Sequence, residues 1–337
     1  MNRFFKTFLT ETQNQNEEIC AGTGIFLKGC IAMYQVTDDM FYKDYILNYA
    51  DQLVNRNGII KGYENGSFTI ENMDLGSTLI WVYEQTGEEK YRLAIDTLKD
   101  KVREFKVECE ESHSGWKKCD IRNIYYVQPF YMEYETKYEN KECYLQIIAQ
   151  FKNARKYLFN SEQAMIHLEN DEAKPKNIGI YGEESSPCET VARYLMALIE
   201  TMDKMSIEIF EHYKLLEQYF KEALKEILAA YDRESGLSNQ QIDGFDEENT
   251  LMLAYSIMKA CQMKVILSEK YYGVAERIWN NLSIKNRQKH HNLKQELTTD
   301  ELWNNRRMVG ILMMTYSQYM IGNKTKKIKE LGCCYEQ

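Results

Sequence analysis

The 337-residue chain contains 44% hydrophobic residues, enough to bury a substantial core. Its three prolines and 17 glycines argue against an all-β fold, because β-architectures need many turn residues and helices exclude both residue types. The formal net charge of −9 at pH 7 argues against nucleic acid as a partner, since neutralising phosphates requires a clustered basic face. The composition therefore predicts an all-α protein.

Nine cysteines occur without a C-x-x-C pair, so the sequence predicts neither a disulfide framework nor a zinc site. The N-terminal residues 1–9 are interrupted by Lys6 and therefore lack the uninterrupted apolar core of a signal peptide. No apolar run approaches membrane-spanning length. The few glycines lie apart and form no nucleotide-binding loop. We therefore expect a cytoplasmic protein that uses no metal or cofactor and does not associate with a membrane.

Helix-length apolar stretches repeatedly end in a short polar turn and restart on a helix with a tyrosine in its first turn. Clear junctions lie at residues 36–42, 85–91, 138–144 and 267–271, and weaker ones at 203–213 and 322–328. The second helices recur about every 50 to 70 residues and are marked by Tyr42, Tyr91, Tyr144, Tyr213, Tyr271 and Ile328. This self-repeat predicts six helical hairpins.

The two helices of each hairpin differ in their apolar pattern. First helices are apolar on most sides, as in residues 251–258 and 309–314. Second helices keep a polar face, as in the helix where Tyr91, Ala94, Ile95, Leu98, Val102 and Phe105 alternate with charged residues. An inner ring of helices wrapped by an outer ring predicts an (α/α)6 barrel, a six-hairpin toroid that forms a single domain over residues 1–337.

Helix starts and loops agree with this arrangement. Ser186-Pro187-Cys188-Glu189 combines a serine cap, a proline at the first helical position and a glutamate three residues after the cap. The longer loops, residues 58–67, 110–118, 168–185 and 235–247, enter inner helices. In a toroid such loops gather at one mouth, where we expect a ligand site.

Residues 76–91, with the turn Thr86-Gly87-Glu88-Glu89-Lys90-Tyr91, resemble the unsaturated rhamnogalacturonyl and glucuronyl hydrolases of glycosyl hydrolase families 88 and 105. The likeness covers nearly the whole chain, from residues 24–34 through Pro129-Phe130 to residues 271–275. It implies an (α/α)6 barrel and hydration of the enol-ether double bond of an unsaturated uronic acid at the non-reducing end of an oligosaccharide. In such enzymes an aspartate acts as general acid and base.

In the resemblance, counting back from Pro129-Phe130, the position of the family's catalytic aspartate is occupied by Arg122. A guanidinium cannot replace it, because it is protonated at every accessible pH. Asp120 could take over only if the helix start shifts, and is otherwise an ordinary helix-start acid. Glu71 falls on a second family aspartate and lies near Asp74, so the two could act as base and acid. The alternative is a solvated acidic pair favoured by the helix dipole.

The resemblance also yields candidate substrate-binding residues. Lys117, Arg122 and Arg193 could hold the carboxylate of the sugar. Glu189 falls on a family arginine, so we hypothesise that it forms an ion pair with Arg122, because a lone charge reversal in a cleft would be costly. His167 occupies the position of a family histidine and is either a pocket residue or a surface histidine. The remaining candidates, Trp116 and Trp303, could stack on a sugar ring.

The sequence leaves three classes of function open. The chain is a glycoside hydrolase acting on an unsaturated uronic acid end, or a catalytically silent pseudo-enzyme that binds a sugar, another anionic small ligand or a partner protein through the barrel mouth. The third class is a structural protein whose mouth is filled by its own side chains. A partner protein and a homo-oligomer are both compatible with the sequence.

Overall fold

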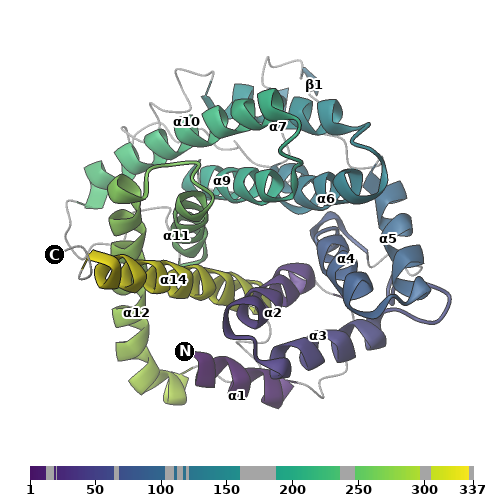
Figure 1. Ribbon diagram of the computed structural model, residues 1–337, viewed down its shortest axis with the longest axis horizontal. Coiled ribbons are helices and arrows are strands. Elements are labelled where there is room, and N and C mark those ends of the chain that lie inside the picture. The colour runs from purple at the N-terminus through teal and green to yellow at the C-terminus, as the bar shows by residue number, and fades with distance from the viewer. Residues whose placement is uncertain are drawn as a thin grey trace. The chain divides into compact units, whose positions relative to one another are not determined.

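The computed structural model of the protein describes residues 1–12, 19, 21–63, 68–102, 110–111, 117–118, 121–159, 187–235, 247–296 and 305–333. Helices form almost all of the regular structure in these residues, as the composition predicts (Figure 1). The α-helices are α1 (Asn2–Thr12), α2 (Thr23–Thr37), α3 (Met40–Leu53), α4 (Leu75–Thr86), α5 (Glu89–Val102), α6 (Gln128–Tyr138), α7 (Tyr144–Phe159), α9 (Pro187–Lys204), α10 (Phe210–Ser235), α11 (Glu247–Gln262), α12 (Ser268–Glu296) and α14 (Arg306–Cys333).

Shorter elements interrupt this helical pattern. They are a 3₁₀ helix η1 (Ile70–Asn72), a π-helix η2 (Asn123–Val127) and two strands, β1 (Glu110–Glu111) and β2 (Lys117–Lys118). The strands pair antiparallel inside the segment expected to be a loop, with Glu110 opposite Lys118. A ladder of this length leaves the all-α class unchanged.

The chain divides into two compact units. The first unit contains Met1–Asp96 and Ala254–Gln337, and the second contains Thr97–Leu253. Both boundaries fall inside helices, α5 and α11, whereas boundaries between independent domains usually fall in exposed linkers. The single domain expected over residues 1–337 stays a prediction.

In the first unit, glycines allow α2 and α14 to pack with their backbones in contact. A Cβ atom on Gly29 would lie 2.6 Å from the carbonyl oxygen of Gly310, and one on Gly310 would lie 2.5 Å from that of Ile25. Real side chains do not approach so closely, so a larger residue at either position would force the helices apart. Nearly all of the first eleven residues of α2 are buried as a result.

The helices α2, α4 and α14 run in the same direction. The start of α2 meets the start of α14 where Gly22 packs on Arg307, and it meets the start of α4 where Gly24 packs on Asp74. Farther along α2 and α4, the rings of Tyr34 and Trp81 are 5.9 Å apart. The N-termini of these three helices therefore meet at one end of the first unit.

The expected hairpin turns are confirmed at the first five junctions, which separate α2 from α3, α4 from α5, α6 from α7, α9 from α10 and α11 from α12. The sixth expected turn, at residues 322–328, is wrong, because α14 continues through Gly322 to Cys333. A Cβ atom at Gly322 would collide with the hydroxyl of Tyr272 in α12. This glycine therefore permits a close approach between helices and does not end a helix.

The N-terminal helix α1 lies beside α14, where the sequence analysis expects a helix after residue 324. The ring centroids of Phe5 in α1 and Tyr316 in α14 are 5.9 Å apart. On its other side, the hydroxyl of Tyr42 in α3 donates a hydrogen bond of 2.5 Å to Asn2. The last inner helix thus has a partner from the other end of the chain.

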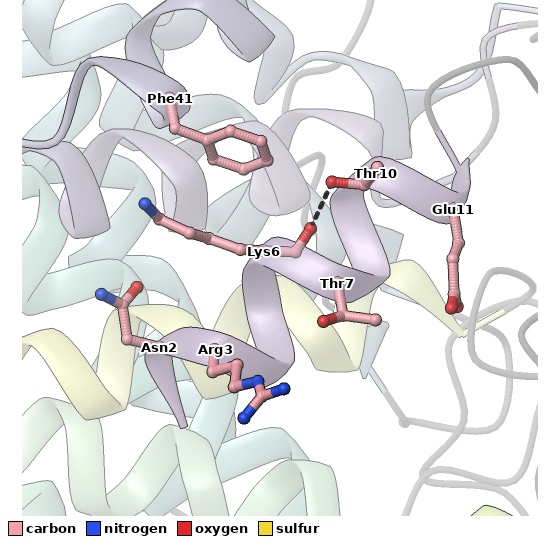
Figure 2. Close-up of a pocket in the computed structure, with 7 residues that line it drawn as sticks. All are labelled: Asn2, Arg3, Lys6, Thr7, Thr10, Glu11 and Phe41. Carbon is pink, nitrogen blue, oxygen red and sulfur yellow. Dashed lines mark hydrogen bonds between the residues drawn. The ribbon is translucent and has the colours of Figure 1, made fainter.

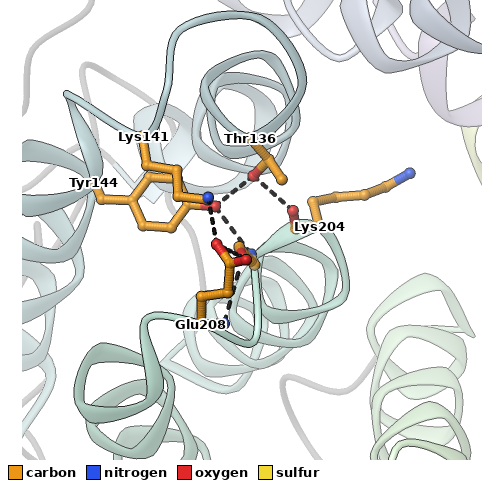
Figure 3. Close-up of polar contacts among 6 residues, drawn as sticks. Thr136, Lys141, Tyr144, Lys204 and Glu208 are labelled. Atoms are coloured by element: carbon orange, nitrogen blue, oxygen red, sulfur yellow. Dashed lines mark hydrogen bonds and ion pairs between the residues drawn. The ribbon is translucent and has the colours of Figure 1, made fainter.

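In the second unit, α6 packs against α9, and α7 and α10 lie alongside them (Figure 1). Polar contacts join the turn after α6 to the turn after α9 (Figure 3). The Tyr144 hydroxyl forms a 2.5 Å hydrogen bond with Thr136 and accepts another, of 2.9 Å, from the backbone N–H of Ser206. Lys141 and Glu208 form an ion pair of 2.6 Å beside it. A first-turn tyrosine can thus connect neighbouring hairpins.

Burial follows the expected difference between first and second helices. Residues 251–258 and 309–314 are buried, as expected of inner helices. In α5, Tyr91, Ala94, Ile95, Leu98 and Val102 are buried while the intervening charged residues reach solvent, and the expected Phe105 lies outside the described residues. The expected helix start at Pro187 is confirmed as the start of α9.

Candidate functional site

Asp74 directly precedes α4 and lies where α2, α4 and α14 begin. It is only 1% exposed, and its carboxylate packs so closely on α2 that a Cβ atom at Gly24 would collide with it. Within the described part of the chain, neither carboxylate oxygen has a hydrogen-bond partner of good geometry. The alternative of a solvated first-turn acid is therefore wrong for Asp74.

Burial dominates the acidity of Asp74 and raises its pKa to about 7, because removal from water disfavours the charged form. Lys28, Arg307 and the backbone N–H groups of Ile25 and Leu75 lower this pKa without outweighing burial. A carboxyl group with a pKa near neutrality can both donate and accept a proton at neutral pH, which is the property of a general acid and base.

Lys28 and Arg307 are the cations that act on Asp74, and neither is among the site residues expected from the sequence. Lys28 is the charged residue of an otherwise uncharged helix that is mostly buried, which is a detectable signal because inner helices rarely carry a charge without a partner. Arg307 lies in the first turn of α14, where the helix dipole disfavours a positive charge. A basic residue at such a position indicates an anion nearby.

Glu71 lies in η1, three residues before Asp74, and is half-buried. A capping box fixes η1, because the Asn72 side chain accepts a 2.9 Å hydrogen bond from the backbone N–H of Thr69. Thr69, Asn72 and the buried Ile70 thus hold the segment that carries Glu71 and leads into Asp74. The catalytic role of Glu71 stays a prediction.

In the second unit, Arg122 is half-buried and directly precedes the π-helix η2. Its expected partner Glu189 forms an ion pair of 2.5 Å with Arg193, one turn farther along α9. Arg193 is only 9% exposed, so this pair is largely shielded from water. The pairing of Arg122 with Glu189 stays a prediction.

The other expected site residues are not placed by the structure. Asp120, Trp116, His167 and Trp303 lie outside the described residues. Lys117 belongs to β2, for which the backbone pairing is described. Glu71 and Asp74 belong to the first unit, whereas Arg122, Glu189 and Arg193 belong to the second, so their assembly into one site stays a prediction.

Two cavities of the first unit lie away from Asp74. An open groove of about 580 Å³ follows α1 and reaches Phe41, toward which Lys6 extends (Figure 2). Lys6 forms an ion pair with Asp39 and lies 5.2 Å from the ring centroid of Phe41, and none of the lining residues is buried. A second cavity of about 400 Å³ lies near Leu53 and Lys61. Neither contains a buried titratable group, so Asp74 is the stronger candidate.

The described residues contain no group of three His, Cys, Asp or Glu side chains that could hold a metal ion. Among the helices in the described ranges, none is long and apolar enough to cross a membrane.

Comparison with known proteins identifies similar sequences and folds. The model of Glycosyl Hydrolase Family 88 matches residues 1–316. A family 105 glycoside hydrolase from C. acetobutylicum ATCC 824 is 19% identical, with 82% of each chain covered and a TM-score of 0.61. A family 88 glycosyl hydrolase from Bacteroides vulgatus is 12% identical, with 94% of this chain and 97% of that chain covered and a TM-score of 0.61. A possible GH105 member from Klebsiella pneumoniae subsp. pneumoniae MGH 78578 is 13% identical, with 90% of this chain and 82% of that chain covered and a TM-score of 0.57.

These similarities confirm the expected fold class, the all-α (α/α)6 barrel. At such low identity they show the fold alone, and a fold does not by itself carry a function.

Proposed function

Because this chain belongs to glycosyl hydrolase family 88, we propose that it adds water to the unsaturated uronic acid end of an oligosaccharide, with Asp74 as general acid and base. Family membership supports a glycosyl-hydrolase-like function in carbohydrate metabolism. The observation that carries the finer proposal is the burial of Asp74, which raises its pKa to about 7.

The chemistry requires a group that gives a proton and takes one back. In its acid form, Asp74 donates its proton to one carbon of the enol-ether double bond, and positive charge develops on the other carbon and the ring oxygen. Asp74 then accepts a proton from the water molecule that attacks this second carbon. The net reaction adds one water across the double bond and restores the protonated Asp74.

The test is turnover of an unsaturated uronyl disaccharide, followed by loss of the alkene's ultraviolet absorbance. We expect turnover by the wild-type protein and a loss of about 10²- to 10⁴-fold in Asp74→Asn, which keeps the shape of the side chain but cannot transfer the proton. Asp44→Asn, which changes an exposed acid on α3, is the matched control and should leave the rate unchanged.

Two further variants assign the acid if the proposal fails. If Asp74→Asn is fully active while Asp120→Asn or Glu71→Gln is inactive, the acid is one of those residues. If the folded wild-type protein turns over no substrate, the chain is not an active hydrolase of this type.

A catalytically silent pseudo-enzyme is the second candidate, and Arg122 favours it. The resemblance expects the catalytic aspartate at this position, and an arginine there cannot exchange a proton. Such a protein would bind a sugar or a partner protein through the barrel mouth. Binding of the disaccharide without turnover would identify it.

We also propose a cytoplasmic location. Cys30, Cys143 and Cys261 are free thiols in the described part of the chain, and free thiols are favoured in a reducing compartment. A protein partner or a homo-oligomer stays a prediction.

A further inference from the structure

We propose that Lys28 binds the carboxylate of the substrate's uronic acid at the point where α2, α4 and α14 begin. This inference rests on the proposed function, because it takes the uronic acid end as the ligand. It adds a substrate-binding residue that the expected set, Lys117, Arg122 and Arg193, does not include.

Helix geometry places Lys28 beside Asp74. Gly24 is the residue of α2 that touches the Asp74 carboxylate, and Lys28 follows it by four residues. Residues four apart lie on the same face of a helix. Helical side chains also tend to lean toward the N-terminus, which favours an approach of the Lys28 side chain to Asp74 past Gly24. The electrostatic influence of Lys28 on Asp74 agrees with this placement.

The surroundings of Lys28 favour an anionic ligand. The N-termini of three helices meet there, and each contributes the positive end of its dipole. Arg307 adds a positive charge from the first turn of α14. The Asp74 carboxylate lies in this positive region, is only 1% exposed, and has no hydrogen-bond partner of good geometry among the described residues.

Lys28 offers a ligand a positive charge nearer the surface than the buried Asp74. Lys28 is partly exposed, so part of its side chain reaches the surface from a region where Asp74 is covered. Within the described ranges, Lys28 has neither an ion pair nor a hydrogen bond. A partly exposed lysine close to a buried acid can receive a second anion beside that acid.

The chemistry of the substrate requires a cation at this place. In an unsaturated uronic acid the carboxylate is attached to one carbon of the double bond, and the proton is delivered to the other. The group that binds the carboxylate must therefore lie next to the group that donates the proton. Lys28 meets this requirement with respect to Asp74, and a charge-assisted hydrogen bond would hold the carboxylate.

The test is calorimetric binding of two disaccharides that the protein cannot hydrate, one ending in saturated glucuronic acid and the other in glucose. We expect the wild type to bind the glucuronyl disaccharide more tightly than the glucosyl one. Lys28→Met, which keeps the length of the side chain, should weaken glucuronyl binding about 10- to 100-fold and leave glucosyl binding unchanged. Lys28→Arg should restore part of the affinity.

The matched control is Lys43→Met, which changes a half-buried lysine of α3 that donates a 2.8 Å hydrogen bond to Gln85. It should leave binding of both disaccharides unchanged. If Lys28 has only a structural role, Lys28→Met will weaken the binding of both disaccharides equally, and this result would overturn the inference. If Lys28→Met does not fold, Lys28→Gln replaces it, and failure of the wild type to prefer the glucuronyl ligand overturns the inference without any variant.

The outcomes separate this inference from the proposed function. Glucuronyl binding that depends on Lys28, without turnover of the unsaturated disaccharide, would support the inference and contradict the hydrolase. Turnover that depends on Asp74 but is unaffected by Lys28→Met would support the hydrolase and overturn the inference.

Discussion

The buried carboxylate of Asp74 opposes folding at neutral pH, because an ionised group whose hydrogen bonds are poor is costly to remove from water. The cost is limited in two ways. Lys28 and Arg307 supply positive charge, and the raised pKa allows the group to bind a proton. A position that reduces stability in this way is typical of functional sites, where residues are placed for chemistry.

The first prediction concerns the pH dependence of stability. The folded pKa of Asp74, about 7, lies above its unfolded value of 3.8, so between these values the folded state holds a proton that the unfolded state has released. The contribution of Asp74 to the free energy of unfolding is therefore fully present below about pH 4 and is lost as pH rises to about 7.

Asp74→Asn removes this titration, so the variant should gain stability relative to wild type as pH rises. The gain should approach about 4 kcal/mol at most, since one pKa unit is worth about 1.4 kcal/mol. Urea unfolding of both proteins between pH 4 and pH 8 measures the difference. A difference that does not change with pH would mean that Asp74 is hydrated and titrates normally.

The candidate site could be predicted from the sequence in part. Glu71 was found because it falls on a family aspartate, and Asp74 because it lies near Glu71, but the burial of Asp74 was not foreseen. Lys28 and Arg307 were missed because α2 and α14 lie far apart in sequence. Their proximity to Asp74 depends on the packing of glycines against other helices, which no local pattern reveals.

At the scale of elements, the contact between α2 and α14 depends on glycine at both Gly29 and Gly310. Helix propensity alone would favour alanine at each position by about 1 kcal/mol. The close approach of the backbones therefore decides which residue is tolerated there. Some glycines of the first unit are therefore required for helix packing, whereas others are not.

Gly310→Ala and Gly273→Ala should have opposite effects on stability. At Gly310 a new methyl group would collide with the backbone of Ile25, so we expect destabilisation of about 1 to 3 kcal/mol. At Gly273, an exposed position in α12, nothing lies within 4 Å of the added atom, so we expect stabilisation of about 0.5 to 1 kcal/mol. Chemical denaturation measures both, and stabilisation by both variants would mean that α2 and α14 do not pack so closely.

The sequence predicted most hairpin turns because polar residues separate two helices with different apolar patterns. It failed at residues 322–328, since Gly322, Asn323 and Lys324 form a plausible turn that tertiary packing overrides. It could not identify α1 as the neighbour of α14, because that contact joins opposite ends of the chain.

At the scale of the whole molecule, the first unit is built from two separate parts of the chain. Residues 1–96 supply α2 and α4, and residues 254–337 supply α14. The buried face of α2 packs on α14, so neither part contains a complete core. Folding of this unit therefore requires contacts between residues far apart in sequence, which carry a large cost in chain entropy.

The last prediction follows from this division. A fragment of residues 1–96 should show little helix by circular dichroism and no cooperative unfolding, because α2 would expose its apolar surface. Mixing it with a fragment of residues 254–337 should restore both signals. Residues 97–253 are the control, since α6, α7, α9 and α10 pack on one another within that fragment and should fold more fully alone. Cooperative unfolding of residues 1–96 alone would show that α2 folds without α14. The glycine contact between the two helices would then form after folding and would not be required for it.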